Sequence, residues 1–237
     1  MKETTLTSRL VGDAQNMGID LFGVAAADGF SDPEYLGKRP GDVFPGLASV
    51  VVIGVAVPKG AIRPLPRGRA QYTNTLMAGT ATLRVAAFAL ARTLEAEGYG
   101  AAIVPCEGSE FGYWYADRQT LMADFSMKYA AWLAGLGSFG KNHLLITEAY
   151  GPRVRLAALL TDAPLEPGRP VGGLLSEQCA GCTRCIEACP VGAFTHEGID
   201  RQKCASYMFG ELGGLRCGMC IRACPLAGEH RGGSVHE

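Results

Sequence analysis

A chain of 237 residues, 48% hydrophobic and 19% charged, is long enough for one full domain with a real core and a second, smaller domain. The formal net charge of −1 and the lack of a dense Lys/Arg run give no electrostatic footprint for nucleic acid, so we expect no nucleic-acid partner. The N-terminus lacks the apolar core of a signal peptide, and no stretch is long and apolar enough for a membrane span. We therefore expect a cytoplasmic protein without a membrane partner.

The N-terminal part begins with apolar periodicity that predicts an amphipathic helix over residues 4–17, ending at Gly18. Two apolar, β-branched runs follow at 19–25 and 49–57. The second is continuous enough to predict a strand buried on both faces.

The segment 58–69 contains three prolines and two glycines and is expected to lack regular structure. It carries Lys59, Arg63, Arg67 and Arg69. Two interpretations stay open: a solvated loop, or a loop that folds over an anionic ligand, since the guanidinium fork suits phosphate and carboxylate.

Further along, the pattern predicts helices over 73–97 and 124–134. Shorter apolar runs predict strands at 101–104, 143–147 and 153–161. This alternation of helices and strands favours an α/β layer fold (α+β in the wider sense). The Pro/Gly-rich stretch 164–173 indicates a linker, so we expect one domain over 1–172 and a small one over 173–237.

Two features between these elements have open roles. Cys106 stands apart from the other cysteines and is either a buried, inert thiol or a reactive one. The segment 109–117 gathers four aromatic residues, including Tyr113 and Tyr115. They form either core or the flat wall of a site for a large planar ligand.

The turn from Gly135 to Lys141 matches the phosphate-loop pattern G-x4-G-K, but Asn142 stands where Ser or Thr should hold magnesium. The turn also follows a helix and opens a strand, which is the wrong order for a phosphate loop. Gly135, Gly137 and Gly140 would instead let backbone approach a bulky cofactor, with Lys141 and Asn142 as polar groups at the site. A plain turn with an exposed Lys is the alternative.

The stretch from Cys179 to Cys224 holds eight of the nine cysteines in two sets of four. The first set reads C-x2-C-x2-C-x3-C-P, and the second is the same run with its first interval stretched to twelve residues. The sets are Cys179, Cys182, Cys185 and Cys189, then Cys204, Cys217, Cys220 and Cys224. This is the run of bacterial two-cluster ferredoxins, and it predicts two [4Fe-4S] clusters.

The ligand sets are expected to cross, because the fourth Cys of such a run binds the other cluster. Cluster I then takes Cys179, Cys182, Cys185 and Cys224, and cluster II takes Cys189, Cys204, Cys217 and Cys220. Paired zinc sites usually use two separate C-x2-C knuckles, and disulfides need an oxidising compartment, so both alternatives fit less well.

The run AAWLAGLGSFGKNHLLITEAYGPRVRLAALLTDAPLEP, followed by the double cysteine motif, resembles the epoxyqueuosine reductase and reductive dehalogenase superfamily, and most closely its short members. The resemblance covers residues 120 to 226 well. At the position where epoxyqueuosine reductases carry an acidic residue, this chain has Leu121, with Asp124 three residues later.

The resemblance implies a nitroreductase-like α/β domain that holds cobalamin, followed by the two-cluster ferredoxin-like domain. We expect an oxidoreductase in which the clusters pass low-potential electrons to a corrinoid or to a small substrate. The electron donor would be a ferredoxin or flavodoxin, and a homodimer is left open. The alternatives are a non-catalytic electron-transfer module for a partner enzyme, a flavin enzyme on the same fold, and tRNA modification of the epoxyqueuosine-reductase type.

The candidate site combines the glycine turn with three tyrosines. Tyr72 follows the Arg-bearing loop and is the first candidate for a proton donor, since a phenol beside a reduced metal centre can supply a proton. Lys141 is the second catalytic candidate, while Tyr113 and Tyr115 are candidate cofactor walls.

Overall fold

The computed structural model describes residues 5–33, 35, 37–107, 109–110, 113–114, 116–123, 125–195 and 198–228, with the backbone alone at 109–110 and 113–114. The chain forms two compact units that interleave along the sequence. Unit 1 comprises residues 1–55, 80–136 and 156–170, and unit 2 comprises 56–79, 137–155 and 171–237. The whole cysteine-bearing segment belongs to unit 2, together with two segments from earlier in the chain.

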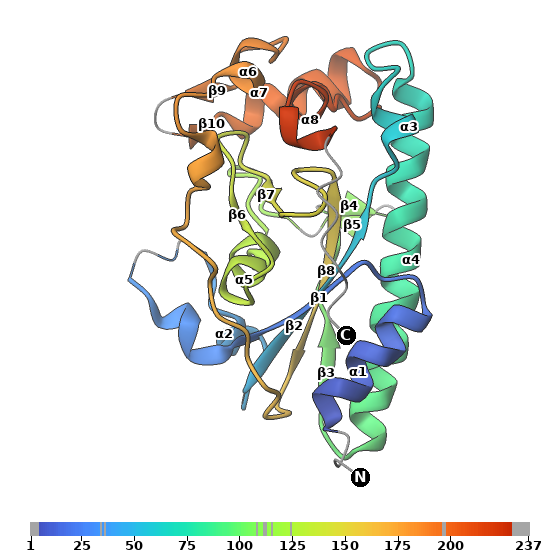
Figure 1. Cartoon of the computed structure of the whole chain (residues 1–237), viewed down its shortest axis with the longest axis vertical. Coiled ribbons are helices and arrows are strands. Elements are labelled where there is room, and N and C mark those ends of the chain that lie inside the picture. Colours follow the sequence, from blue (N-terminus) through green and yellow to red (C-terminus); the bar gives the residue numbers. More distant parts are fainter. Residues whose placement is uncertain are drawn as a thin grey trace. The chain divides into compact units, whose positions relative to one another are not determined.

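The elements are labelled in Figure 1. The helices are α1 (Leu6–Asn16), α2 (Pro40–Val43), α3 (Lys59–Ile62), α4 (Arg69–Ala96), α5 (Met127–Leu133), α6 (Arg184–Glu187), α7 (Arg201–Ser206) and α8 (Met219–Arg222). The strands are β1 (Leu21–Ala26), β2 (Ser49–Ala56), β3 (Ala101–Ile103), β4 (Ser109–Glu110), β5 (Tyr113–Trp114), β6 (Ser138–Phe139), β7 (Leu145–Ile146), β8 (Val154–Thr161), β9 (Phe194–Thr195) and β10 (Gly198–Ile199). Short 3-10 turns lie at Ala27–Ser31, Glu177–Cys179 and Pro225–Ala227, and a π turn lies at Tyr207–Glu211.

The main sheet has the strand order β1-β2-β8-β3. β1 pairs antiparallel with β2, and β3 pairs antiparallel with β8. At the two ends of the central pair, the Ala48 N–H donates to the Thr161 carbonyl and the Val57 N–H to the Arg153 carbonyl, so β2 and β8 also run in opposite directions. The fold is therefore mixed α/β with an antiparallel sheet.

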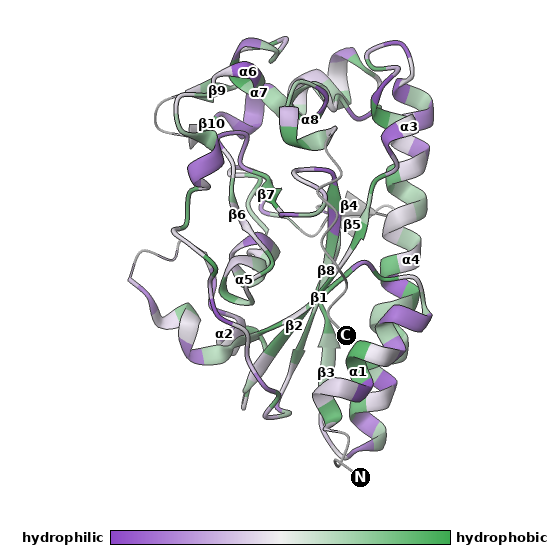
Figure 2. Ribbon diagram, viewed as in Figure 1, coloured by the Kyte–Doolittle hydropathy of each residue, from purple (hydrophilic) through white to green (hydrophobic). Residues whose placement is uncertain are grey.

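Alternation along the strands separates the two faces of this sheet. On β1, Phe22 and Val24 pack into the larger core with α1 and α4, whereas Gly23 lies against Ala134 and Leu136, at the end of α5. Figure 1 shows α1 and α4 on one side of the sheet and α5 on the other. β2 is buried along nearly its whole length, as predicted, and the hydrophobic colouring of the sheet strands agrees (Figure 2).

Local chemistry explains the helix ends and several differences from the sequence-based expectation. The Thr5 and Ser126 side chains accept from backbone N–H groups in the first turns of α1 and α5, so α5 begins at Met127 rather than at 124. α4 begins at Arg69, four residues before the predicted start at 73.

Two predicted elements were wrong in detail. Residues 58–69 are not wholly irregular, because α3 occupies Lys59–Ile62 directly after Pro58. The strand expected over 143–147 shrinks to Leu145–Ile146, since His143 has a φ of +56°, which no extended strand allows.

Unit 2 has its own small core. It comprises Val57, Ala61, Ile62, Leu65, Tyr72 and Leu76, against which Met77, Met219 and Ile221 pack. Apolar residues on both sides of the Arg-bearing segment thus pack against α8, within the second cysteine set. This segment is therefore built into the unit that carries the cysteines.

Cys106 lies in the core of unit 1, where its side chain is 9% exposed and its thiol donates to the Val104 carbonyl. This burial agrees with the interpretation of a buried thiol. Within the described part of the chain, no helix is both long enough and apolar enough to cross a bilayer.

Candidate functional site

Four cysteines from two separate segments line one small cavity in unit 2. They are Cys179, Cys182, Cys185 and Cys224. The first three come from the turn before α6 and from α6 itself, and the fourth follows α8. These are the four residues that the spacing assigned to cluster I, so the fold brings the crossed set together.

The thiols of this set are close enough to affect one another. Burial raises the pKa of the Cys185 thiol, and the neighbouring Cys179 and Cys182 raise it further. The pKa of Cys224 is also raised, first by burial and then by Cys179 and Cys185. These mutual effects show that the four thiols lie near one another, as the ligands of one cluster must.

The second set gathers in the same way. Burial raises the pKa of Cys220 to about 12, and Cys217 and Cys204 add to this increase. The pKa of Cys204 is raised by burial and by Cys217 and Cys189. In the described part of the chain, no three His, Cys, Asp or Glu side chains are placed to hold one metal ion. A cubane makes a different demand, because each thiolate binds a different iron at an outer corner of the cluster.

Tyr72 lies directly on the loop of the second set. Its side chain is 2% exposed, and a Cβ built at Gly218 would be 2.5 Å from its ring. Gly218, with a φ of +68°, is the residue after Cys217. Burial raises the pKa of Tyr72 well above its ordinary value, and nearby Cys220 contributes in the same direction. Tyr72 is thus a core residue packed against the cysteine loop and keeps its proton.

Lys141 and Asn142 line the cavity of the first cysteine set. The Lys141 ammonium donates to the Cys182 carbonyl at 3.0 Å. The Asn142 side chain is 3% exposed, and its Oδ1 accepts from the Leu144 N–H at 3.2 Å. Both residues of the glycine turn therefore face the cysteine segment, with Lys141 holding the loop and Asn142 shaping its own turn.

The glycines of this turn are approached by the chain's own atoms. A Cβ at Gly135 would be 2.5 Å from the Arg169 carbonyl oxygen, and one at Gly137 would collide with the Ile146 carbonyl oxygen. A Cβ at Gly140 would be 2.6 Å from the side-chain oxygen of Asn142. Close packing of the chain accounts for these glycines, and a role for them in cofactor binding stays a prediction.

Several predicted positions fall at the margin of the described structure. The Tyr113 side chain and the whole of Tyr115 and Asp124 lie outside the described residues. Leu121 has a φ of +55°, which is uncommon for a residue other than glycine. The structure therefore leaves the aromatic wall as a prediction.

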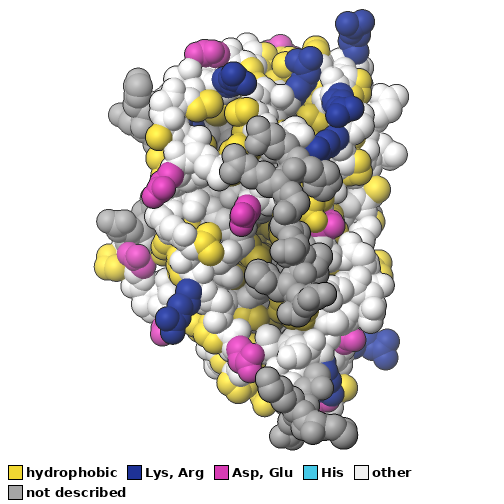
Figure 3. Space-filling view, in the orientation of Figure 1, with side chains coloured by type: hydrophobic (Ala, Val, Ile, Leu, Met, Phe, Trp, Pro, Cys, Tyr) yellow, Lys and Arg dark blue, Asp and Glu magenta, His cyan; other side chains and the backbone are white. Residues whose placement is uncertain are grey.

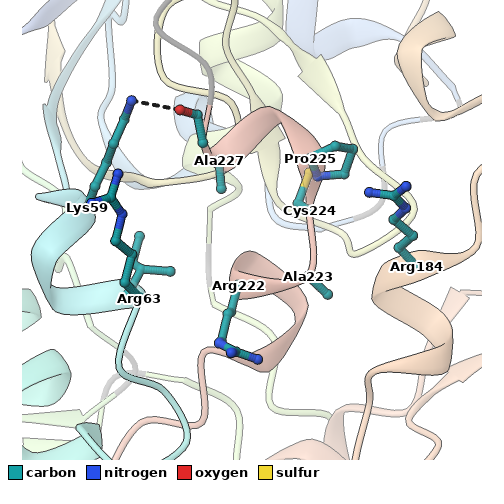
Figure 4. A pocket seen from close by; sticks show the side chains of 10 residues that line it. Lys59, Arg63, Arg184, Arg222, Ala223, Cys224, Pro225 and Ala227 are labelled. Atoms are coloured by element: carbon teal, nitrogen blue, oxygen red, sulfur yellow. Dashed lines mark hydrogen bonds between the residues drawn. The ribbon is translucent and has the colours of Figure 1, made fainter.

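Sequence reasoning missed that basic residues of the cysteine motifs join those of the loop 58–69. Lys59 and Arg63 from that loop share a pocket with Arg184 and Arg222 (Figure 4). Arg184 stands directly before Cys185, and Arg222 two residues before Cys224. The presence of an arginine inside each cysteine motif was the sequence signal that could have predicted this basic pocket.

Comparisons with known proteins point in one direction. Residues 175–195 match the 4Fe-4S binding domain family. The epoxyqueuosine reductase of Bacillus subtilis is 32% identical over 117 residues, covering 44% of this chain and 29% of the relative. The tetrachloroethene reductive dehalogenase of Desulfitobacterium hafniense is 34% identical over 113 residues, covering 38% of this chain and 20% of the relative. The matched regions thus span less than a third of these relatives.

Solved structures show the same fold over nearly the whole chain. An epoxyqueuosine reductase with an epoxyqueuosine-modified tRNA-Tyr stem loop has a TM-score of 0.67 at 23% identity, covering 95% of this chain and 66% of that one. A reductive dehalogenase described for B12-dependent dehalogenation has a TM-score of 0.70 at 18% identity, covering 96% and 34%. The superfamily resemblance is confirmed: the homologues of this chain are the epoxyqueuosine reductases and the reductive dehalogenases.

Proposed function

We propose that this protein is an iron–sulfur oxidoreductase whose two [4Fe-4S] clusters pass electrons to a corrinoid or to a small substrate. The observation that carries the proposal is the cavity lined by Cys179, Cys182, Cys185 and Cys224. A set drawn from both motifs is what two ferredoxin-type clusters require. The thiols of the second set also lie close enough to raise one another's pKa, and this set would hold the other cluster.

The chain's own residues would prepare the first cluster site. Lys141 fixes the Cys182 carbonyl, so the cysteine loop keeps one geometry as charge changes nearby. The Lys141 ammonium also favours the negative charge that thiolates and added electrons bring. We infer that Lys141 positions this loop around the buried Cys185.

The corrinoid proposal rests on the relatives, among which is a B12-dependent reductive dehalogenase. A bound corrinoid would supply a metal centre for one-electron chemistry. Tyr72 would hold a proton at its Oη, because a buried phenol with a raised pKa stays neutral. The proposed cofactor-binding residues remain those of the glycine turn with Lys141 and Asn142, together with Tyr113 and Tyr115. The domain division 1–172 and 173–237 stays a proposal beside the two interleaved compact units of the fold. The proposed donor is a ferredoxin or flavodoxin.

A second candidate is tRNA modification of the epoxyqueuosine-reductase type. The observation that favours it is the shared fold with a reductase holding a tRNA stem loop, with 66% of that chain covered. A fluorescence anisotropy titration with a tRNA-Tyr anticodon stem loop tests it. Tight, salt-sensitive binding would support this candidate over a small-molecule substrate.

The main proposal is tested by equilibrium dialysis of anaerobic, iron-reconstituted protein against cobalamin and, separately, against FMN. We expect about eight irons per chain and about one bound corrinoid, with no flavin. Gly137→Val is a poor probe, because it would disturb the backbone at Ile146 whether or not a cofactor binds. Asn142→Ala and Lys141→Arg probe the proposed site with less damage, because Lys141→Arg keeps a donor for the Cys182 carbonyl. Protein that binds FMN and no corrinoid would contradict the proposal.

A further inference from the structure

A pocket of about 490 Å³ in unit 2 has a lining with four cationic side chains: Lys59, Arg63, Arg184 and Arg222. They come from three segments, namely α3 with the residue after it, α6 and α8. Figure 4 shows these side chains around the pocket, with Cys224 and Pro225 between them. In the space-filling view, Lys and Arg side chains gather where Figure 1 labels α3 and α8 (Figure 3).

These cations lack anionic partners within the described part of the chain. The pocket lining contains no Asp or Glu. The Lys59 ammonium donates at 2.7 Å to the Gly228 carbonyl, an uncharged acceptor. No hydrogen bond or ion pair involves the side chains of Arg63, Arg184 or Arg222 among the described residues. Like charges held together in this way repel one another, and a bound anion would relieve that repulsion.

The pocket shares a wall with the proposed site of cluster I. Arg184, Cys224 and Pro225 line both this pocket and the cavity of the first cysteine set. A ligand in the pocket would therefore lie beside a thiolate of that cluster. Its charge would act at short range on any electron that the cluster accepts.

We propose that this pocket binds the phosphate or pyrophosphate group of a small molecule. Its volume lies in the range of about 300–1,000 Å³ that small-molecule sites occupy. A guanidinium group can bind two phosphate oxygens through its planar pair of N–H donors, and the pocket lining offers three such groups, with the Lys59 ammonium as a point charge. A concave site of this size suits a compact anion better than the flat face of a protein partner.

Anion binding would also tune cluster I, and this part rests on the proposed function. A bound anion makes the cluster harder to reduce, so it lowers the reduction potential. Coupling is reciprocal, so reduction of the cluster weakens anion binding by the same factor. The pocket would then release its ligand when the cluster becomes reduced.

Isothermal titration calorimetry of the anaerobic holoprotein with inorganic pyrophosphate tests the pocket. We expect saturable binding of one pyrophosphate, weakened at least fivefold by Arg63→Gln and by Arg222→Gln. Arg67→Gln is the matched control, because Arg67 lies in the same segment, is exposed and does not line the pocket. It should change the affinity less than twofold. Equal weakening by all three variants would overturn the proposal in favour of diffuse surface charge.

Two further arms separate the possible ligands. Citrate in place of pyrophosphate distinguishes carboxylates from phosphates, and equal or tighter citrate binding would overturn the phosphate assignment. Titration with an acidic ferredoxin tests a docking face. Binding of that protein through Arg63 and Arg222, without any pyrophosphate binding, would overturn the small-molecule proposal.

A redox titration followed by electron paramagnetic resonance, with and without saturating pyrophosphate, tests the coupling. We expect a lower potential for one cluster, and no shift in Arg222→Gln. Unchanged potentials while pyrophosphate binds would overturn the coupling. Pyrophosphate binding that depends on Arg63 and Arg222 in protein lacking [4Fe-4S] signals would support the pocket and overturn the proposed function.

Discussion

The ammonium group of Lys141 donates a hydrogen bond of 3.0 Å to the carbonyl oxygen of Cys182. The two residues lie 41 positions apart in the sequence, one at the end of a glycine turn and the other in the first cysteine motif. Both also line the cavity of the first cysteine set. The turn that resembles a phosphate loop in sequence is thus a support for the cysteine loop.

Lys141→Met should make the first cluster more labile. The variant loses a charged hydrogen bond worth about 1.5 kcal/mol, so iron should leave this cluster roughly tenfold faster. The measurement is release of iron to a chelator under anaerobic conditions, with the two clusters distinguished by Mössbauer spectroscopy. Lys141→Arg keeps a donor and should recover much of the stability. Equal labilisation of both clusters would contradict the local role.

Gly218 and Gly181 provide a matched pair for the tyrosine contact. They have similar φ values of +68° and +66°, but a Cβ at Gly218 meets the Tyr72 ring and also Cδ1 of Leu65, while a Cβ at Gly181 meets no atom within 4 Å. Gly181→Ala should therefore cost only the backbone strain of about 1–2 kcal/mol. Gly218→Ala should cost about 1–3 kcal/mol more, because its methyl group overpacks the site.

Thermal unfolding of the anaerobic proteins measures this difference. The double variant Gly218→Ala/Tyr72→Ala removes the ring that Gly218→Ala alone would strike. The two substitutions should therefore be less harmful together than the sum of their separate effects. Additive effects would show that Tyr72 does not limit the residue at position 218.

Tyr72→Phe and Tyr72→Ala separate packing from proton donation. The phenylalanine variant keeps the buried ring and should lose less than about 1.5 kcal/mol of stability with unchanged iron content. The alanine variant leaves a cavity and should lose about 3–5 kcal/mol. If Tyr72 also donates a proton, Tyr72→Phe lowers kcat on any substrate found while stability is retained. A stable variant with full activity would leave Tyr72 as a core residue alone.

Cys224→Ala tests the crossed ligand sets. Because Cys224 shares a cavity with Cys179, Cys182 and Cys185, its loss should damage their cluster and spare the other. Mössbauer and electron paramagnetic resonance spectra of the reconstituted variant measure this. Loss of the cluster at Cys217 and Cys220 would contradict the assignment. Cys106→Ser provides the control, since that thiol lies in the core of unit 1 and should not affect the iron content.

Local sequence patterns were sufficient for the strands and helices that bury a continuous apolar face. The run 49–57 became β2, the run 153–161 became β8, and the Ala-rich stretch after 73 became most of α4. Cysteine spacing predicted which thiols share the first cavity, because ligand geometry repeats at fixed intervals. The first signal depends only on nearby residues, whereas the second combines two short motifs that lie far apart in the sequence.

Long-range pairings could not be obtained in this way. Nothing in the local pattern pairs β3 with β8, or packs the apolar residues around Tyr72 against α8. The sequence around the glycine turn likewise does not reveal that the backbone of Ile146 lies against Gly137, and the predicted role of the turn in cofactor binding stays a prediction. The sequence indicated an anion site only at Lys59 and Arg63. Arg184 and Arg222 line the same pocket because the fold brings them there, which no local pattern predicts.

The most direct test of the central claim is electron transfer from the protein's own clusters to an added corrinoid. Anaerobic protein, reduced and freed of excess reductant, is mixed with cobalamin, and absorbance follows the clusters and the corrinoid together. The account predicts that the corrinoid spectrum changes in proportion to the electrons stored, while cluster absorbance returns to the oxidised level. It also predicts that Cys220→Ala protein transfers fewer electrons. Fully reduced clusters that leave the spectrum of cobalamin unchanged would contradict the account.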